Sequence, residues 1–358
     1  MRINVALMLS LVLICQTFAY TSASKFLDKP AEWYAGDDAK RMADNILTFQ
    51  AKEGAWPKNI ETAEKPYTGD PKELEGTFDN GATTIEMYFL AKVAHATHEK
   101  KYEESFNKAL ALILKGQYDN GGWPQSYPIH GGDGGYDHYI TFNDGAMTRL
   151  MFLLRDVYSS DVYNFVPDET KQACRKAFDK GIECILKCQI KVNGKLTAWC
   201  AQHDEKTFEP RPARKFEPIS ISGCESVGIV HVLMTIEKPS PEVAASIDAA
   251  VAWLDSVKIP GIRIEDTPNK DLPKGIQRRV VKDPSAPPMW ARFYEIGTNR
   301  PIFSDRDTIV VYDLMEIGDE RRNGYQWLKY WPKNLIEKEY PEWKKKHSET
   351  ASTTAISK

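Results

Sequence analysis

Residues 54–59 read GAWPKN and residues 77–82 read TFDNGA, and both patterns return about 65 residues later, as GGWPQ at 121–125 and TFNDGA at 141–146. Repeats of this length are typical of folds in which helical hairpins bury their apolar faces against neighbouring copies. The sequence therefore predicts an all-α fold, an (α/α) toroid or barrel of helical hairpins. Equivalent loops then meet at one rim, so we expect the two acidic runs to lie close together.

A third, weaker copy supports the repeat. Trp199 is followed 23 residues later by the run SGCE at 222–225, and Trp56 and Asp79 have the same separation. Apolar residues spaced for one helical face predict the individual helices. We expect them at 38–51, from the Asp79–Asn80 pair to residue 93, and at 102–114, 143–158, 168–188, 223–234, 241–257 and 306–317.

The connections between these helices are predicted to be long. No comparable set of alternating β-branched segments is present, so we expect only short irregular or β segments within the loops. The stretch 260–288, which contains several Pro and Lys residues, is predicted to be a long functional loop over the surface of one domain.

Both ends of the chain predict segments outside the folded domain. Residues 1–23 read as a cleaved signal peptide, because the apolar run at 5–15 is too short to span a bilayer as a stable anchor. The protein is then secreted or periplasmic. Residues 24–346 are predicted to form a single domain and 347–358 a polar tail. Five cysteines remain in the mature chain, and Cys184 and Cys188 are assigned to the core.

The charge balance argues against a general polyanion partner. The formal net charge is -3, which gives no bulk basic field for nucleic acid. Any attraction of an anion must be local, as at the cluster of Arg211, Arg214 and Lys215. We expect no nucleic-acid partner and a monomer.

The two acidic runs are candidates for a metal site. Asp79, Asn80, Asn143 and Asp144 bring carboxylate and amide oxygens to predicted helix starts, and a hard cation such as Ca²⁺ prefers oxygen ligands. The alternative is that these residues are ordinary N-caps. Their repetition in the same Trp-Pro context favours ligands.

Arginines beside aromatic or proline residues are candidates for binding an acidic ligand. Arg214 lies in the stiff run EPRPAR at 209–214, and Arg292 and Arg300 lie in the run 290–303 among aromatic residues. Guanidinium groups suit bidentate binding of carboxylates. Internal salt bridges, for Arg214 with Glu209 or Glu217, are the alternative.

Other candidates are weaker. Trp56 and Trp123 could stack on sugar rings or could pack inside the repeat, and packing is at least as well supported. His203 has an acidic neighbour in Asp204, but no nucleophile motif accompanies it, which argues against a catalytic triad.

Taken together, the motifs resemble polysaccharide lyase family 10, the helical pectate lyases, over roughly residues 40–331. The resemblance is carried by the runs GWPQ at 122–125, TFDNGAT at 77–83, ITFNDGAM at 140–147, WCAQHD at 199–204, PAR at 212–214, SGCESVG at 222–228 and the segment 290–303.

The resemblance implies an (α/α) toroid that cleaves α-1,4-polygalacturonate (pectate) by calcium-assisted β-elimination and gives 4,5-unsaturated oligogalacturonides. It also implies roles for residues that match the family pattern. Arg214 corresponds to the catalytic base, Asp79 and Asp144 to the acids of the calcium site, and Arg300, with Asn80 and Arg292, to substrate-binding residues. The sequence departs from the family at Gly145, where the family often has a second Asp after Asn-Asp.

Two other functions compete with this one. A toroidal glycoside hydrolase would use Asp79 and Asp144 as general acid and base. A non-catalytic pectin-binding protein would keep the fold without turnover. Arg214 argues against the second alternative, whereas Gly145 mildly favours it.

Overall fold

The structure is a computed structural model that describes residues 22–130 and 135–347. The predicted signal peptide, apart from its last two residues, and the predicted polar tail, apart from its first, lie outside the described residues. The leader and the domain limits therefore stay predictions. Within the described ranges, no helix is both long enough and apolar enough to cross a membrane.

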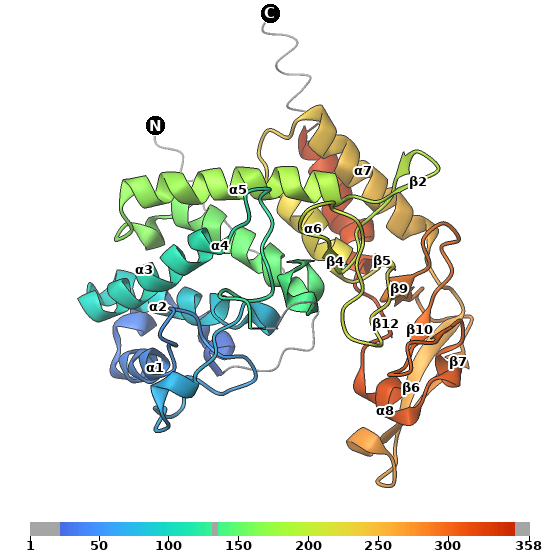
Figure 1. The fold of residues 1–358 in the computed structure, drawn as a ribbon, viewed down its shortest axis with the longest axis horizontal. Helices are drawn as coiled ribbons and strands as arrows, with labels where there is room; N and C mark the ends of the chain where they lie inside the picture. Colours follow the sequence, from blue (N-terminus) through green and yellow to red (C-terminus); the bar gives the residue numbers. More distant parts are fainter. Residues whose placement is uncertain (1–21, 131–134, 348–358) are drawn as a thin grey trace, which may run out of the picture.

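Helices are the main regular elements of the fold (Figure 1). They are α1 (Asp37–Thr48), α2 (Thr84–Thr97), α3 (Lys100–Lys115), α4 (Ala146–Ser159), α5 (Asp168–Cys188), α6 (Glu225–Met234), α7 (Pro241–Ser256) and α8 (Asp319–Gly324). A last helix, at 333–347, contains a π-helical segment at Leu335–Glu339. The predicted helix 168–188 matches α5, and six other predicted helices are found with shifted ends.

Successive helices form hairpins that stand side by side. Helix α2 packs on α3, α4 on α5 and α6 on α7, and the first helix of each hairpin contacts the next, α2 with α4 and α4 with α6. The apolar residues of all these helices belong to one buried core. The expectation of a mainly helical chain is confirmed, although the described helices do not close into a barrel.

Four buried tryptophans repeat one contact along the chain. Each indole N–H donates to a backbone carbonyl in the last turn of a helix: Trp56 to Ile46 of α1, Trp123 to Ile113 of α3, Trp199 to Ile185 of α5 and Trp290 to Leu254 of α7, at 2.7–2.8 Å. The last carbonyls of a helix have no partner within it, so each indole completes a helix end. Trp56 and Trp123 are fully buried, so the idea that they stack on sugars is wrong.

The strands are short, with one exception. The two-residue strands are β1 (Ile140–Thr141), β2 (Lys191–Val192), β3 (Lys195–Leu196), β4 (Gln202–His203), β5 (Ile221–Ser222), β8 (Trp290–Ala291), β9 (Phe293–Tyr294), β10 (Phe303–Ser304), β11 (Val310–Val311) and β12 (Leu328–Lys329). They pair as β1 with β4, β2 with β3, β5 with β9, β8 with β12 and β10 with β11. The hydrogen bonds of these strand pairs hold loops in place near the helix ends.

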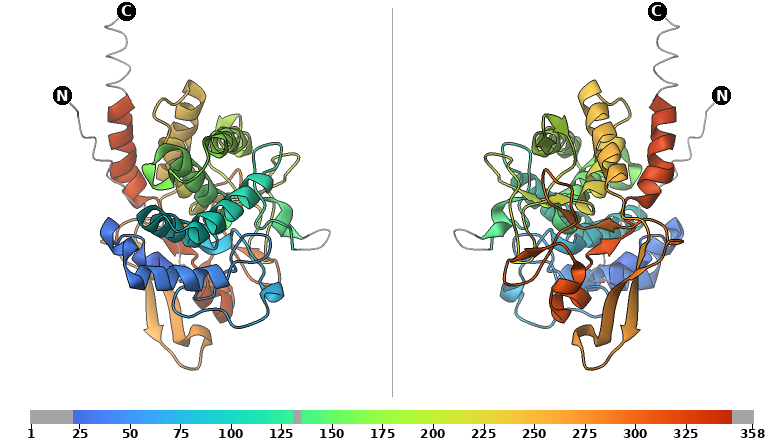
Figure 2. Two further views of the ribbon diagram at one scale, coloured as in Figure 1. Left: turned by 90° about the vertical axis from the view of Figure 1, so that its left-hand side faces the viewer. Right: turned by 90° about the vertical axis from the view of Figure 1, so that its right-hand side faces the viewer.

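The exception is a long antiparallel hairpin of β6 (Ile262–Pro268) and β7 (Ile276–Lys282), in which Ile262 faces Lys282. The stretch 260–288, predicted to be a long functional loop, is therefore largely a β-hairpin. Ile recurs in β6, and Ile and Val recur in β7, and both residues favour extended structure. The side chains of the hairpin are partly buried or exposed, so the apolar signal is weak. Figure 2 shows it projecting from the side opposite α7.

The predicted helix at 306–317 is also wrong. The segment holds β11 and a single 3₁₀ turn, Leu314–Glu316, which starts at a capping box formed by Asp313 and Glu316. Thr308 has a positive φ of 70°, which interrupts any helix there. The β-branched pair Ile309 and Val310 is exposed, so burial does not favour a helix in the first half of this segment.

Candidate active site

Two turns of the same backbone shape form the centre of the site. Asp79–Gly81 and Asn143–Gly145 are single 3₁₀ turns that precede α2 and α4, and they contact each other. The second residue of each is left-handed, with φ 55° at Asn80 and 49° at Asp144, a conformation that Asn and Asp tolerate better than most residues. The predicted meeting of the two acidic runs is confirmed.

The same backbone bonds hold these turns in place. In each case the carbonyl two residues after a repeat tryptophan accepts from the start of the preceding turn. Gln125 accepts from Phe78, Ala201 from Phe142 and Asn143, and Arg292 from Gly223, at 2.8–3.0 Å. Each turn is therefore hydrogen-bonded to the tryptophan loop of the next copy, and these bonds place the turns side by side along one rim.

Because the two turns have equivalent backbones, Asp79 and Asp144 do not occupy equivalent positions. Asp79 occupies the position of Asn143, and Asn80 occupies that of Asp144, because the four residues come in the order Asp-Asn and then Asn-Asp. In the third copy, Glu225 takes the place of Asp144, three residues after Ser222. The site thus has a third acid that the sequence interpretation did not name.

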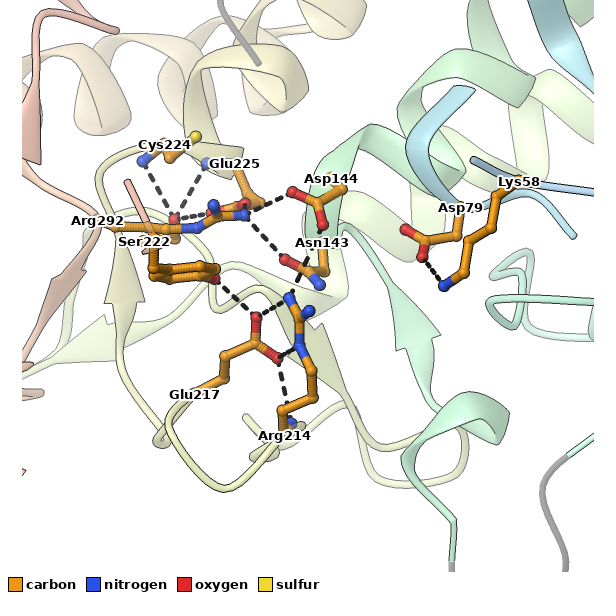
Figure 3. Close-up of polar contacts among 11 residues, drawn as sticks. Lys58, Asp79, Asn143, Asp144, Arg214, Glu217, Ser222, Cys224, Glu225 and Arg292 are labelled. Atoms are coloured by element: carbon orange, nitrogen blue, oxygen red, sulfur yellow. Dashed lines mark hydrogen bonds and ion pairs between the residues drawn. The ribbon is translucent and has the colours of Figure 1, made fainter. Parts of the chain in front are cut away.

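Neither acid caps a helix through its side chain. Helix α2 starts at Thr84 after Thr83, and α4 starts at Ala146 after Gly145, with no side-chain cap in either case. The N-cap alternative for Asp79 and Asp144 is therefore wrong. Their carboxylates are held by basic side chains instead (Figure 3).

Asp79 is paired with a lysine. Its Oδ2 lies 2.5 Å from Nζ of Lys58, whose side chain is 40% exposed, whereas that of Asp79 is only 6% exposed. The other oxygen, Oδ1, is buried and has no hydrogen-bond partner among the described residues. Figure 3 shows that oxygen directed toward the side of the site where Asp144 lies. A buried carboxylate oxygen without a partner is costly and is suited to a cation or water.

Asp144 is held by a buried arginine. Nη2 of Arg292 lies 2.8 Å from Asp144 Oδ1 and 3.0 Å from Asn143 Oδ1, and it also contacts Glu225. Glu225 in turn accepts from Ser222 Oγ. Arg292 is only 5% exposed, and its guanidinium carbon lies 4.7 Å from the centre of the Tyr325 ring. The three acceptors share one nitrogen, which fixes the direction of the guanidinium.

Arg214 approaches Asp144 from the other side. Its Nη2 is 4.0 Å from Asp144 Oδ2. Glu217 holds it with two bonds, Nε to Oε2 at 2.9 Å and Nη2 to Oε1 at 2.5 Å. The phenol of Tyr325 donates to the same Glu217 at 2.7 Å. Tyr325 therefore links the Arg214–Glu217 pair to Arg292, whose guanidinium lies over its ring.

These contacts shift the pKa values of the site. Burial acts to raise the pKa of Asp144, but the charge and hydrogen bond of Arg292, with Arg214 and Arg149, lower it overall. Burial acts to lower the pKa of Arg214, but the hydrogen bonds and charge of Glu217 raise it overall. At neutral pH Asp144 is thus a carboxylate and Arg214 a guanidinium.

The predicted substrate-binding residues Asn80 and Arg300 lie in different parts of the structure. Asn80 is at the rim, in the position equivalent to Asp144. Arg300 is not held in the cluster: its guanidinium carbon lies 3.4 Å from the centre of the exposed Tyr312 ring, and Tyr312 donates to Glu295. No contact recorded for the described residues joins Arg300 to Asp144 or Arg214.

The weaker sequence candidates are structural. His203 is fully buried, its Nδ1 lies 2.8 Å from the Phe208 carbonyl, and its Nε2 accepts from the Cys200 amide. Burial lowers its pKa to about 4, so it is neutral and without a nucleophile partner. Arg211 pairs with Asp204. All five cysteines of the described chain are buried and unpaired, as expected for core positions.

Sequence reasoning missed Lys58, Glu225 and Tyr325 as members of the site. Lys58 and Arg292 both stand two residues after a repeat tryptophan, so the likeness of WPK at 56–58 to WAR at 290–292 was an available signal. Glu225 could have been found by aligning Ser222 of the third copy with Thr141, which places Glu225 opposite Asp144. Tyr325 carries no local signal, because the β6–β7 hairpin positions its segment: Arg278 of β7 donates to the Tyr325 carbonyl at 3.0 Å.

Comparison with known proteins finds similarity to polysaccharide lyases. A sequence profile described as pectic acid lyase matches residues 50–336. The chain is 34% identical to a mutant of the family 10 polysaccharide lyase from Cellvibrio cellulosa in complex with trigalacturonic acid, with a TM-score of 0.73 over 88% of this chain and 96% of that one. A second structure of the Cellvibrio cellulosa lyase gives 34% identity and a TM-score of 0.71 over 88% and 94%. No curated protein matches.

Proposed function

Because the chain belongs to the pectic acid lyase family and is a polysaccharide lyase, we propose that it is a secreted pectate lyase that cleaves α-1,4-polygalacturonate by β-elimination with Arg214 as base. One observation carries the proposal. The Arg214 guanidinium stands 4.0 Å from Asp144, at the rim where two acidic turns meet. The solved relative with trigalacturonic acid supports the substrate class.

The chemistry needs a base beside a carboxylate. Removal of the C5 proton of a galacturonate places negative charge next to the existing carboxylate, the electron pair forms the C4–C5 double bond, and the C4–oxygen bond breaks. Arg214 accepts the C5 proton in its neutral form, and a proton from solvent completes the leaving hydroxyl. The product is a 4,5-unsaturated oligogalacturonide.

Glu217 decides when Arg214 can act. The bidentate contact holds Arg214 protonated, so the base forms only when this pair opens or when the pH is high. We therefore expect activity to rise into the alkaline range. Tyr325 stays bonded to Glu217 and keeps the carboxylate in reach to reorient Arg214 after each turnover.

Calcium is part of the proposal. Asp79 and Asp144 would hold the ion, and when bound it would neutralise the charge that develops on the substrate carboxylate. The donor chemistry fits: both side chains are carboxylates on touching turns, and Asp79 Oδ1 is buried without a hydrogen-bond partner in the described chain. No group of three or more His, Cys, Asp or Glu is present there, so substrate and water would supply the remaining oxygen ligands.

The remaining assignments follow the same line. Arg292, which holds Asp144, and Asn80, at the equivalent position of the first turn, are proposed to orient the sugar acid at the cleavage site. Arg300 is proposed to bind a carboxylate farther out. The hairpins belong to an (α/α) toroid, and the protein acts as an exported monomer. These parts of the proposal rest on the family relationship and on the position of the residues at or near the rim.

Ultraviolet absorbance of the unsaturated end group tests the proposal. Purified protein is incubated with polygalacturonate in calcium and, separately, in a chelator. We expect absorbance to rise only with calcium and only with Arg214 present. New reducing ends without absorbance would identify a hydrolase, binding without any cleavage would identify a pectin-binding protein, and full rate in chelator would remove calcium from the mechanism.

A further inference from the structure

Arg149 is a fourth basic residue beside the two acidic turns. It lies on α4, five residues after Asp144, and side chains on a helix lean toward its N-terminus. Its Nη1 lies 3.5 Å from the position that a Cβ on Gly81 would occupy. Gly81 closes the turn that carries Asp79. The side chain of Arg149 thus runs from the second turn to the first.

Both carboxylates act on this guanidinium. Burial lowers the pKa of Arg149 to about 10, and the charges of Asp144, Tyr88 and Asp79 oppose that effect. Arg149 in turn helps to lower the pKa of Asp144. Arg149 remains protonated at neutral pH, so a positive charge acts on both proposed calcium ligands.

The charges of the cluster balance without any metal ion. Four acids, Asp79, Asp144, Glu217 and Glu225, stand with four bases, Lys58, Arg149, Arg214 and Arg292. A neutral cluster attracts a free divalent cation less than one with surplus carboxylates. Gly145 adds to this effect, because it provides no acid on the turn that leads into the helix of Arg149.

We infer that Arg149 is an internal cation that competes with calcium for the Asp79 and Asp144 carboxylates and sets a weak calcium affinity in the free protein. This inference rests on the proposed calcium-assisted lyase function. It concerns the chain's own residues: the guanidinium holds the two turns together when the metal is away, and it repels the metal when the metal arrives.

Calorimetric titration of calcium into the substrate-free protein tests the inference. Arg149→Gln removes the charge, and we expect it to bind calcium about tenfold more tightly than the wild type or better. Arg149→Lys keeps the charge and is expected to stay within about threefold of the wild type. Arg155→Gln, on the same helix and paired with Asp156, is the matched control and should leave calcium affinity unchanged.

Circular dichroism establishes that each variant is folded. If Arg149→Gln does not fold, Arg149→Met, which keeps an apolar stem, replaces it with the same expectation. Equal or weaker calcium binding by the charge-free variant, or no detectable binding at all, would overturn the inference. Polygalacturonate cleavage by the wild type is measured in parallel. Absence of lyase activity there would count against the proposed function, whereas the calcium titration decides the role of Arg149.

Discussion

The two acidic turns have the same backbone and different electrostatics. In the first, the acid is at the first position and pairs with Lys58, which is partly open to solvent. In the second, the acid is at the left-handed second position and meets the buried Arg292 on one side and Arg214 on the other. A one-residue exchange of Asp and Asn therefore moves the carboxylate from a pair with one lysine to a network with two arginines.

The copies of the repeat also differ in where they carry positive charge. The position two residues after the tryptophan carries a cation in the first copy, Lys58, and in the fourth, Arg292, but Gln125 and Ala201 in between. The positive side chains thus stand at the two ends of the rim. The acids lie between them, next to Arg214.

The largest effect should come from the arginine that faces only the second turn. Arg214→Ala removes the proposed base, and we expect the rate of polygalacturonate cleavage to fall by about a thousandfold, followed by ultraviolet absorbance. Arg211→Ala, three residues away and paired with Asp204, is the control and should retain most activity. More than about a tenth of the wild-type rate in Arg214→Ala would mean that another group removes the proton.

Stability should separate the two turns. Arg292→Met leaves the fully buried Glu225 without its cation and removes the nearest cation from Asp144, which we expect to lower the free energy of unfolding by about 3 kcal/mol. Lys58→Met removes a cation that is 40% exposed, and we expect a loss of about 1 kcal/mol. Urea unfolding followed by circular dichroism measures both, and similar losses would show that the turns are electrostatically alike.

The pH profile should respond to Glu217. Because Glu217 raises the pKa of Arg214, Glu217→Gln lowers that pKa and increases the neutral fraction of Arg214 at any alkaline pH. We expect the alkaline rise in activity to begin about one pH unit lower, while the maximum rate falls because Arg214 is less well oriented. An unchanged profile would separate Glu217 from the base, and measurement of kcat from pH 7 to pH 11 gives the answer.

The smallest effect should come from the arginine outside both turns. Arg300→Ala removes an exposed cation above Tyr312, and we expect KM for polygalacturonate to rise by a factor of about three to ten with little change in kcat. Arg41→Ala, an exposed residue of α1 paired with Asp38, serves as the control. A fall in kcat at constant KM would place Arg300 at the reacting sugar instead.

Much of the fold could be predicted because the repeat is apparent in the amino-acid sequence. The Trp-Pro loops and the TFDN and TFND runs predicted helical hairpins and a shared rim, and the structure brings Asp79, Asp144 and Arg214 to one region. The helix starts were placed too early, because both acidic runs are separate 3₁₀ turns with a left-handed residue. Backbone geometry of that kind is set by the carbonyls of the next loop, such as Gln125, which no local pattern encodes.

The parts that could not be predicted depend on long-range contacts. Tyr325 reaches Glu217 across 108 positions, and its segment is fixed by the β6–β7 hairpin, whose apolar pattern is weak because the side chains are partly exposed. Lys58 was missed for another reason. A lone lysine near the surface is ordinarily a solvated charge, so the likeness of WPK at 56–58 to WAR at 290–292 was too short a signal to single it out.

The four tryptophans that complete the helix ends also provide an optical probe of each structural unit. Each indole is shielded from water and donates to a helix carbonyl, so loosening of one hairpin should shift the emission of one fluorophore to longer wavelength. Replacing the four with Phe one at a time would assign the fluorescence to successive hairpins. Stopped-flow traces of these variants would then show whether the hairpins come apart in sequence or all at once.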